Sequence, residues 1–168
     1  MLPPRLRPIV VAVVPSLKET AMTDKDLKRL ARQHIDLSWN KGRLALATQL
    51  HSPDFLYKSS FSAQPLDSVG YRQLIEGIRA SMDDLEVVVE ECISEGHKVF
   101  TWSTLVGTIS RPAFGYPASD KVVSIPGMAL WLFNSQGKLQ ELCTLIDMES
   151  FRSQMGLQNR PLAEQALP

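Results

Sequence analysis

The sequence predicts an α+β fold in which N-terminal helices pack on one face of a curved, antiparallel sheet. Two observations support this prediction. Apolar residues recur at helical spacing before Leu85, and from Leu85 on the chain forms runs rich in β-branched residues that are separated by turns. Helices that precede a run of antiparallel strands pack on one face of the sheet, and the space between the two layers is a common place for a ligand.

The first helix is expected to begin after Thr23, a favourable N-cap followed by acidic residues that suit the positive end of a helix. Its apolar face includes His34 and Trp39, and the segment 40–42 is expected to end it. Three further elements follow from apolar spacing and turn residues: a short helix over 44–50, a short strand over 55–57 and a third helix over 70–82.

The second half of the chain consists mainly of predicted strands. Strands over 85–94 and 98–108 flank a turn, and a loop with proline and glycine follows them. The last third predicts a hairpin and a closing helix: strands over 121–133 and 138–147, a turn over 134–137 and a helix over 148–156. Two long apolar strands joined by a tight turn are suited to form the floor of a hydrophobic cavity.

The composition is that of one globular domain. Of 168 residues, 44% are apolar, and 18 basic residues balance 18 acidic ones. A neutral chain lacks the charge that binds nucleic acid or an anionic membrane surface, and no apolar run approaches the roughly 20 residues of a membrane span. We expect a cytoplasmic protein with a flexible extension over 1–22, one domain over 23–156 and a tail over 157–168. A start at Met22 is an open alternative.

Short motifs in a fixed order link the chain to a known family. They are WNKG at 39–42, HSPDF at 51–55, DLEV at 84–87, EGHKV at 95–99, GT at 107–108, FGYPA at 114–118, GK at 137–138 and the segment 147–156. Together they resemble the SnoaL-like polyketide cyclases and ester cyclases of the nuclear-transport-factor-like cone fold. The resemblance covers about residues 23–156.

This resemblance implies a cone-shaped sheet wrapped around N-terminal helices and a closed apolar cavity for a small hydrophobic ketone or ester. It also implies a homodimer, a place in secondary metabolism, and no metal or organic cofactor. In the family, a carboxylate on the last strand and a histidine on the preceding strand act as acid and base. The matching positions here are Thr144 and Leu130, so the scaffold is kept while the usual proton-transfer groups are replaced.

Alternation along the last two strands assigns residues to the cavity wall. If Thr144 faces the cavity, its side of the last strand also carries Gln140, Leu142 and Ile146. On the neighbouring strand we expect Met128, Leu130 and Leu132 to face inward, and Trp131 to face a helix or a dimer partner. Trp39 and Phe55 complete an almost wholly apolar wall, which favours a ligand of low polarity.

Four polar residues are catalytic candidates, and each has a structural alternative. Tyr57 is placed to polarise a substrate carbonyl or is a half-buried core tyrosine, and Thr144 occupies the acid–base position. His34 offers a pKa near neutrality inside the cavity or is a satisfied core histidine. Asp147 is an acid or the N-cap of the closing helix. His51 and His97 are expected to be solvated, and the three histidines are too scattered to bind a metal.

The favoured function is a cofactor-independent cyclase or isomerase of a polyketide-like or terpenoid-like intermediate. It would act chiefly by holding the substrate in a reactive conformation away from water. The alternative is a non-catalytic binding or dimerisation module for a small hydrophobic ligand. Addition of water to an epoxide is a weaker third possibility, because it requires a polar cluster that the sequence does not indicate.

Overall fold

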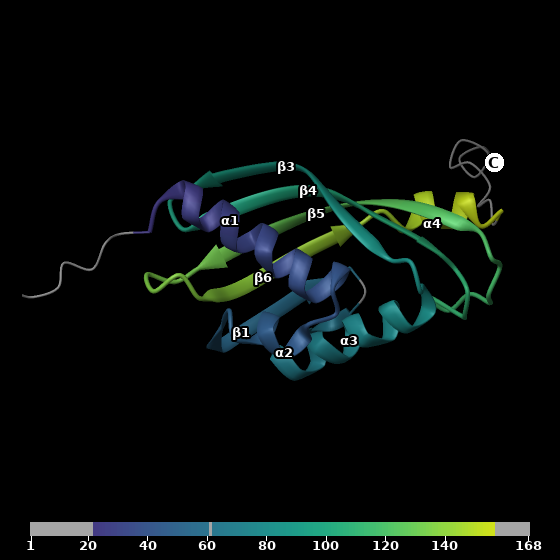
Figure 1. The fold of residues 1–168 in the computed structure, drawn as a ribbon, viewed down its shortest axis with the longest axis horizontal. Helices are drawn as coiled ribbons and strands as arrows, with labels where there is room; N and C mark the ends of the chain where they lie inside the picture. The colour runs from purple at the N-terminus through teal and green to yellow at the C-terminus, as the bar shows by residue number, and fades with distance from the viewer. Residues whose placement is uncertain (1–21, 61, 157–168) are drawn as a thin grey trace, which may run out of the picture.

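The computed structural model describes residues 22–60 and 62–156, which form one curved, open sheet with helices on its concave side (Figure 1). The expected extension over 1–22, except Met22, and the expected tail over 157–168 lie outside the described residues. The helical elements are α1 (Asp24–Ile35), the π-helical turn η1 (Asp36–Asn40), α2 (Leu44–Thr48), α3 (Ser68–Ser81) and α4 (Met148–Gln154). None of the helices in this part of the chain is long and apolar enough to cross a membrane.

The sheet has six strands in the order β2-β1-β6-β5-β4-β3. They are β1 (His51–Ser59), β2 (Ser62–Leu66), β3 (Glu86–Glu95), β4 (Lys98–Thr108), β5 (Val122–Phe133) and β6 (Leu139–Ile146). The expected α+β architecture with a curved sheet is confirmed. The sheet is mixed rather than purely antiparallel, because β1 runs parallel to β6.

The strands β1 and β2 differ most from the sequence prediction. β1 is longer than expected and includes Pro53. Proline has no backbone N–H to donate, and Pro53 lies where the hydrogen-bond ladder between β1 and β6 is irregular, so the strand tolerates it there. β2 was not predicted, because its short sequence contains Pro65 and its middle residues are exposed, so it shows no apolar alternation. It pairs only with β1 and ends the sheet there.

The first helix continues through η1, so its predicted end near Asn40 is confirmed. A capping box between Thr23 and Asp26 begins α1. At the other end, the Asn40 side chain accepts from the backbone nitrogen of Val87 at 2.7 Å and donates to its carbonyl at 3.2 Å. The Arg79 guanidinium from α3 donates to the carbonyls of Trp39 and Asn40. These contacts fix the end of the helix against both β3 and α3.

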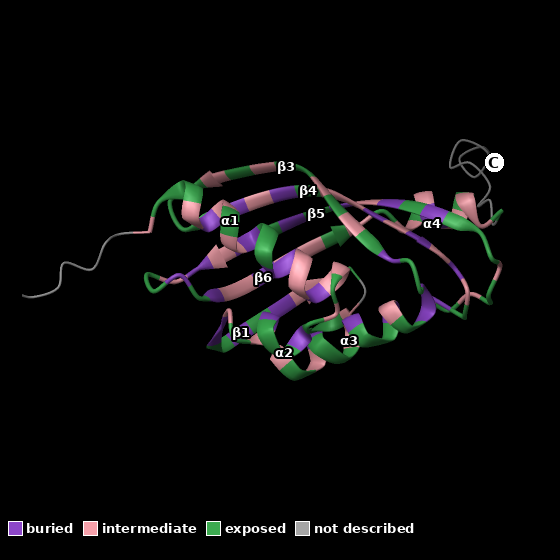
Figure 2. Cartoon of the chain, viewed as in Figure 1, coloured by how far each residue is buried: buried purple, intermediate pink, exposed green. Residues whose placement is uncertain are grey.

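Buried residues alternate along β4 and β5 beneath α1, as Figure 2 shows. They form two apolar clusters. One lies under α1 and contains Tyr57, Tyr71 and Trp131, and the other lies toward α4 and contains Ile125 and Phe151. Trp39 packs against both clusters, so the junction between them lies at the end of η1.

Candidate functional site

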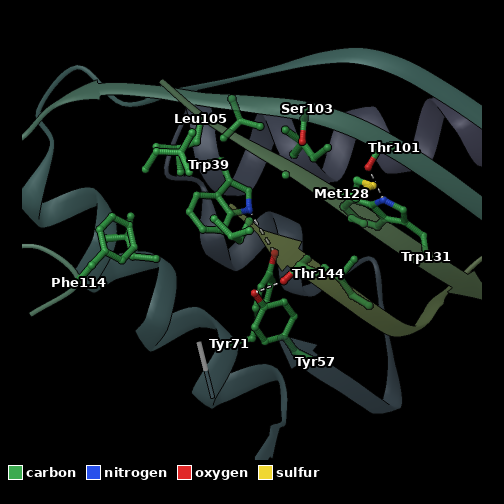
Figure 3. A pocket seen from close by; sticks show the side chains of 18 residues that line it. Trp39, Tyr57, Tyr71, Thr101, Ser103, Leu105, Phe114, Met128, Trp131 and Thr144 are labelled. Atoms are coloured by element: carbon green, nitrogen blue, oxygen red, sulfur yellow. Dashed lines mark hydrogen bonds between the residues drawn. The ribbon is translucent and has the colours of Figure 1, made fainter. Parts of the chain in front are cut away.

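A cavity lies at this junction, between η1, α3 and the concave face of the sheet (Figure 3). Its apolar wall includes Ile35, Trp39, Ile78, Val87, Leu105, Phe114, Ile125, Ala129, Trp131, Leu142 and Ile146. Its polar groups are hydroxyls, from Tyr57, Tyr71, Thr101, Ser103 and Thr144. None of the residues that line it is a carboxylate, a histidine, a lysine or an arginine. The cavity therefore offers hydrogen bonds to a ligand but no group that titrates near neutrality.

The cavity is narrow, and a larger groove lies next to it. Its volume is about 60 Å³, enough for a few water molecules, whereas drug-sized ligands occupy pockets of roughly 300–1,000 Å³. A groove of about 560 Å³ lies between α3 and the loop at 112–114. Ile78 and Phe114 line both spaces. These two side chains therefore lie between the cavity and the groove.

Phe114 is held at this boundary by a tight turn. Ala113 and Tyr116 exchange two backbone hydrogen bonds of 2.9 and 2.8 Å. Between them Phe114 has φ 53° and Gly115 has φ 82°, so both central residues are left-handed. That conformation is uncommon for phenylalanine and costs on the order of 1 kcal/mol. The ring packs edge-on against Phe151 of α4, with centroids 5.1 Å apart, which helps to hold it there.

Tyr57 and Thr144 form the hydroxyl pair of the cavity wall. β1 and β6 run side by side, and the two hydroxyl oxygens are 2.7 Å apart. Burial raises the pKa of Tyr57, so its phenol stays protonated at neutral pH. If Thr144 donates to the phenol oxygen, the Tyr57 hydroxyl proton is available to a ligand carbonyl. Both residues were sequence candidates, and both line the cavity.

Tyr71 of α3 is a polar residue of the wall that the sequence did not single out. Its ring lies 4.5 Å from that of Tyr57, and its hydroxyl accepts from Trp39 Nε1 at 3.3 Å. Burial raises its pKa well above the ordinary value. In the sequence it belongs to the apolar stripe of a helix, a pattern that predicts core packing, and its hydroxyl was the only sign of another role.

His34 lies behind the wall rather than in the cavity, which agrees with the core-histidine alternative, and its pKa is not near neutrality. It is buried, and its Nε2 lies 2.8 Å from Nε2 of His51. Burial, and then the neighbouring His51, lower the pKa of His34 to about 3. His51 was expected to be solvated but is also buried, which lowers its pKa to about 4. Phe55 stacks on His51 at 3.8 Å and does not line the cavity.

Asp147 caps the closing helix, the alternative that the sequence left open. Its Oδ1 accepts from the backbone nitrogen of Ser150 at 2.9 Å. The residue is exposed and is not among those that line the cavity. Gly156, with φ 80°, follows the C-cap residue Met155. The catalytic role suggested for Asp147 has no support from its position.

The inward assignment of Leu130 and Leu132 is wrong. Across the antiparallel pair of β5 and β6, Ala129 lies opposite Thr144 and Trp131 lies opposite Leu142. Directly opposite residues share a face, so Ala129 and Trp131 point inward with the two β6 residues.

The outer face carries the residues between them. Leu130 and Leu132 alternate with the buried positions of β5, and Leu130 is 46% exposed. Met128 is 37% exposed and borders both the cavity and an outer groove. Trp131, expected to face away, is buried in the cavity wall, and its Nε1 donates to Thr101 Oγ1 at 2.9 Å. Trp39, Leu142 and Ile146 line the cavity at the positions assigned to them, and their role in binding stays a prediction.

Comparisons with known proteins agree with this architecture. The family model of the SnoaL-like polyketide cyclases matches residues 29–155. No curated protein gives a significant match.

Solved structures share the fold at low sequence identity. AclR, a proposed hydroxylase from Streptomyces galilaeus, is 21% identical with a TM-score of 0.73, over 86% of this chain and 95% of that one. A proposed SnoaL-like polyketide cyclase from Jannaschia sp. CCS1 is 20% identical with a TM-score of 0.72, over 81% of this chain and 95% of that one. IdmH, a proposed polyketide cyclase from Streptomyces antibioticus, is 19% identical with a TM-score of 0.70, over 77% of this chain and 98% of that one.

The buried histidine pair predicts a loss of stability in mild acid. The pKa values of His34 and His51 are about 3 and 4 in the folded protein, against about 6.5 in an unfolded chain. Below pH 6.5 the unfolded state binds protons that the folded state does not. The free energy of unfolding therefore decreases as the pH is lowered. At pH 5 the loss relative to pH 7.5 is about 2 kcal/mol for His34 alone. Urea unfolding at the two pH values measures it.

The exposed His97 provides the control for this prediction. His97→Gln keeps the full pH dependence, whereas His51→Gln reduces it. Equal unfolding free energies at pH 5 and pH 7.5 in the wild-type protein would contradict the burial of the pair.

Two substitutions distinguish a helix-capping role of Asp147 from a role as a catalytic acid. Asp147→Ala lowers the free energy of unfolding by about 1 kcal/mol, because the Ser150 nitrogen loses its acceptor, whereas Asp147→Asn costs much less. Chemical denaturation measures both. A stable Asp147→Asn variant that has lost all turnover would instead show that the carboxylate takes part in catalysis.

Proposed function

This chain belongs to the SnoaL-like polyketide cyclase family, and from that premise we propose that it is a cofactor-independent cyclase or isomerase of a hydrophobic, polyketide-like or terpenoid-like ketone. One observation carries the proposal. The apolar cavity has a hydroxyl pair, Tyr57 and Thr144, on its wall and no ionisable group with a pKa near neutrality. This combination suits a ketone that enolises readily once a hydrogen bond from the wall polarises its carbonyl oxygen.

The chemistry that fits such a wall is an intramolecular closure. The enol carbon of the substrate attacks a carbonyl carbon of the same molecule, a C–C bond forms, and negative charge develops on the carbonyl oxygen. Tyr57 donates a hydrogen bond to that oxygen while Thr144 donates to the phenol. The enol proton balances the new hydroxyl, so the net reaction consumes no proton. Enclosure contributes by holding the two carbons close together and excluding water.

The substrate would span both the cavity and the groove, because the cavity alone is too small for a polycyclic ketone. The Phe114 ring would move aside for entry. The groove also carries Gln73, Ser60 and Ser81, whereas the cavity carries hydroxyls only. The more polar end of the ligand is therefore expected in the groove.

Anthrone, a tricyclic ketone that enolises, is a direct probe of this proposal. Its affinity follows from tryptophan fluorescence, since Trp39 and Trp131 line the cavity, and enolisation follows from deuterium uptake at its methylene carbon. Ala129→Leu fills the cavity and is expected to abolish binding. Tyr57→Phe keeps binding and lowers the exchange rate by roughly 100-fold, the usual effect of losing one hydrogen-bond donor to a developing oxyanion.

Three results would separate the possibilities. Binding with faster exchange than in buffer supports the enzyme, and products from larger polyketide-like ketones are then sought by mass spectrometry. Binding without conversion of any tested ketone favours the alternative, a binding module. The lack of an acid–base group in the cavity wall is the observation that favours this alternative. Unchanged binding in Ala129→Leu would place the ligand elsewhere.

The outer face of the sheet supports the expected homodimer. Two cross-strand rows run over it, one through Ile93, Phe100, Leu130 and Cys143, and the other through Trp102, Met128 and Leu145. We propose a second copy of this chain as the occupant, because the charges at the two ends of these rows are complementary. Glu91 lies beside Trp102 on β3, and Lys58, which pairs with Glu141 at 2.8 Å within the chain and would exchange that partner for Glu91 of the second copy, lies beside Cys143 on β1. A two-fold axis along β5 would bring Glu91 of each copy over Lys58 of the other.

Light scattering tests the dimer. Leu130→Gln is expected to convert the dimer to a monomer that still binds anthrone, while the adjacent Ala129→Leu stays dimeric and does not bind. The two residues differ only in the face to which they point. A wild-type monomer at high micromolar concentration would contradict the proposed interface.

A further inference from the structure

We propose that Ser103 is a second polar contact of the cavity, which binds an oxygen of the ligand on the side away from Tyr57. The inference rests on the proposed function, because it concerns the ligand of the same cavity. It narrows that ligand to a ketone with a second oxygen, either a carbonyl or a hydroxyl. The sequence did not single out Ser103, because a serine within a strand gives no sign of a ligand.

The hydroxyl of Ser103 is the one hydroxyl of the wall without a hydrogen-bond partner in the part of the chain that the structure describes. The other four each have a partner: Tyr57 and Thr144 bond to each other, and Tyr71 and Thr101 accept from indole nitrogens. A hydroxyl has one donor and two acceptor positions. Ser103 therefore keeps this whole capacity for a molecule that enters the cavity.

The packing around Ser103 explains why no protein group reaches its hydroxyl. Its neighbours across the sheet are Val89 on β3 and Gly127 on β5, and neither has a polar side chain. A β-carbon at Gly127 would lie 2.9 Å from Ile146 Cδ1, so an apolar methyl group covers that position. Thr101, two residues earlier on the same face of β4, is buried, whereas Ser103 is only half-buried. The open side of Ser103 is the cavity that it lines.

An unpaired hydroxyl in an apolar wall makes the cavity selective. A polar group that loses water without gaining a partner costs free energy. A ligand with an oxygen against Ser103 satisfies the hydroxyl, whereas a purely apolar ligand leaves it unpaired and binds less tightly. Packing alone would favour an aliphatic side chain here, like the buried Val99 and Leu105 on the same face of β4.

The sheet sets the distance between the two polar contacts. Ser103 lies on β4 and Thr144 on β6, with β5 between them and an offset of two residues, and Figure 3 shows them on different sides of the cavity. Two strand spacings of about 4.8 Å and an offset of about 7 Å place their Cα atoms about 12 Å apart. Two hydrogen bonds of about 2.8 Å each then leave at most about 6 Å between the ligand oxygens. This separation suits oxygens on opposite carbons of a six-membered ring.

Two ligands of matched shape test the contact. 4-Hydroxy-1-tetralone and 4-methyl-1-tetralone are bicyclic ketones that enolise, and they differ only in the group across the ring from the carbonyl. Isothermal titration calorimetry gives the ratio of their dissociation constants. Ser103→Ala is expected to shift this ratio about tenfold against the hydroxy ligand, because the ligand hydroxyl loses its partner. Comparing ratios removes the difference in hydrophobicity between the two ligands.

Two further variants separate a ligand contact from a structural role. Thr104→Val removes a hydroxyl from the opposite face of the same strand and should leave the ratio unchanged. In the ligand-free protein, Ser103→Ala should keep the wild-type unfolding midpoint, because it breaks no internal hydrogen bond. Thr101→Val should lower the midpoint, because Trp131 loses its acceptor.

An unchanged ratio in Ser103→Ala, or a wild-type protein that binds neither tetralone, would overturn the second contact. Deuterium uptake beside the carbonyl of the same ligands tests the proposed function separately. Uptake faster than in buffer with an unchanged ratio would leave the enzyme standing without this contact. A shifted ratio without such uptake would support the contact and favour the binding module over the enzyme.

Discussion

The pairing of β5 with β6 is the constraint on which the rest of the site depends. It places Ala129 opposite Thr144 and Trp131 opposite Leu142, so these four side chains share the concave face. A shift of one residue would exchange the two faces of β5, bringing Leu130 inside and Trp131 outside. The polarity of the cavity, its size and the apolar outer face all follow from this register. The parallel contact of β1 then brings Tyr57 beside Leu142 and its hydroxyl to Thr144.

The interior that results separates its chemistry into two layers. Hydroxyl groups form the first layer around the cavity, where they donate and accept but do not ionise near neutral pH. The histidine pair forms the second layer, shielded from the ligand space by Ser38 and Tyr71. Burial keeps both rings neutral, and a neutral ring has one donor and one acceptor nitrogen. The same burial makes the folded protein sensitive to mild acid.

Local patterns were sufficient to predict most of the fold. The cap at Thr23, the third helix and the strand over 98–108 follow from capping and periodicity, which act over a few residues. The position of β1 beside β6 could not be predicted, because that contact joins residues more than 80 positions apart. For the same reason the alternation along β5 was recognised but its inward side was assigned wrongly. The proximity of His34 and His51 likewise depends on how α1 and β1 pack, and the spacing of the two residues does not reveal it.

The most direct test of this account is to observe which face of β5 meets a ligand. Methyl-labelled protein, titrated with anthrone, reports on both faces in one spectrum. The account predicts that the methyl groups of Ala129, Ile125 and Leu142 shift, while those of Leu130 and Leu145 do not. Shifts confined to Leu130 and Leu145 would show that the ligand binds the outer face, and would contradict the assignment of the interior cavity as the functional site.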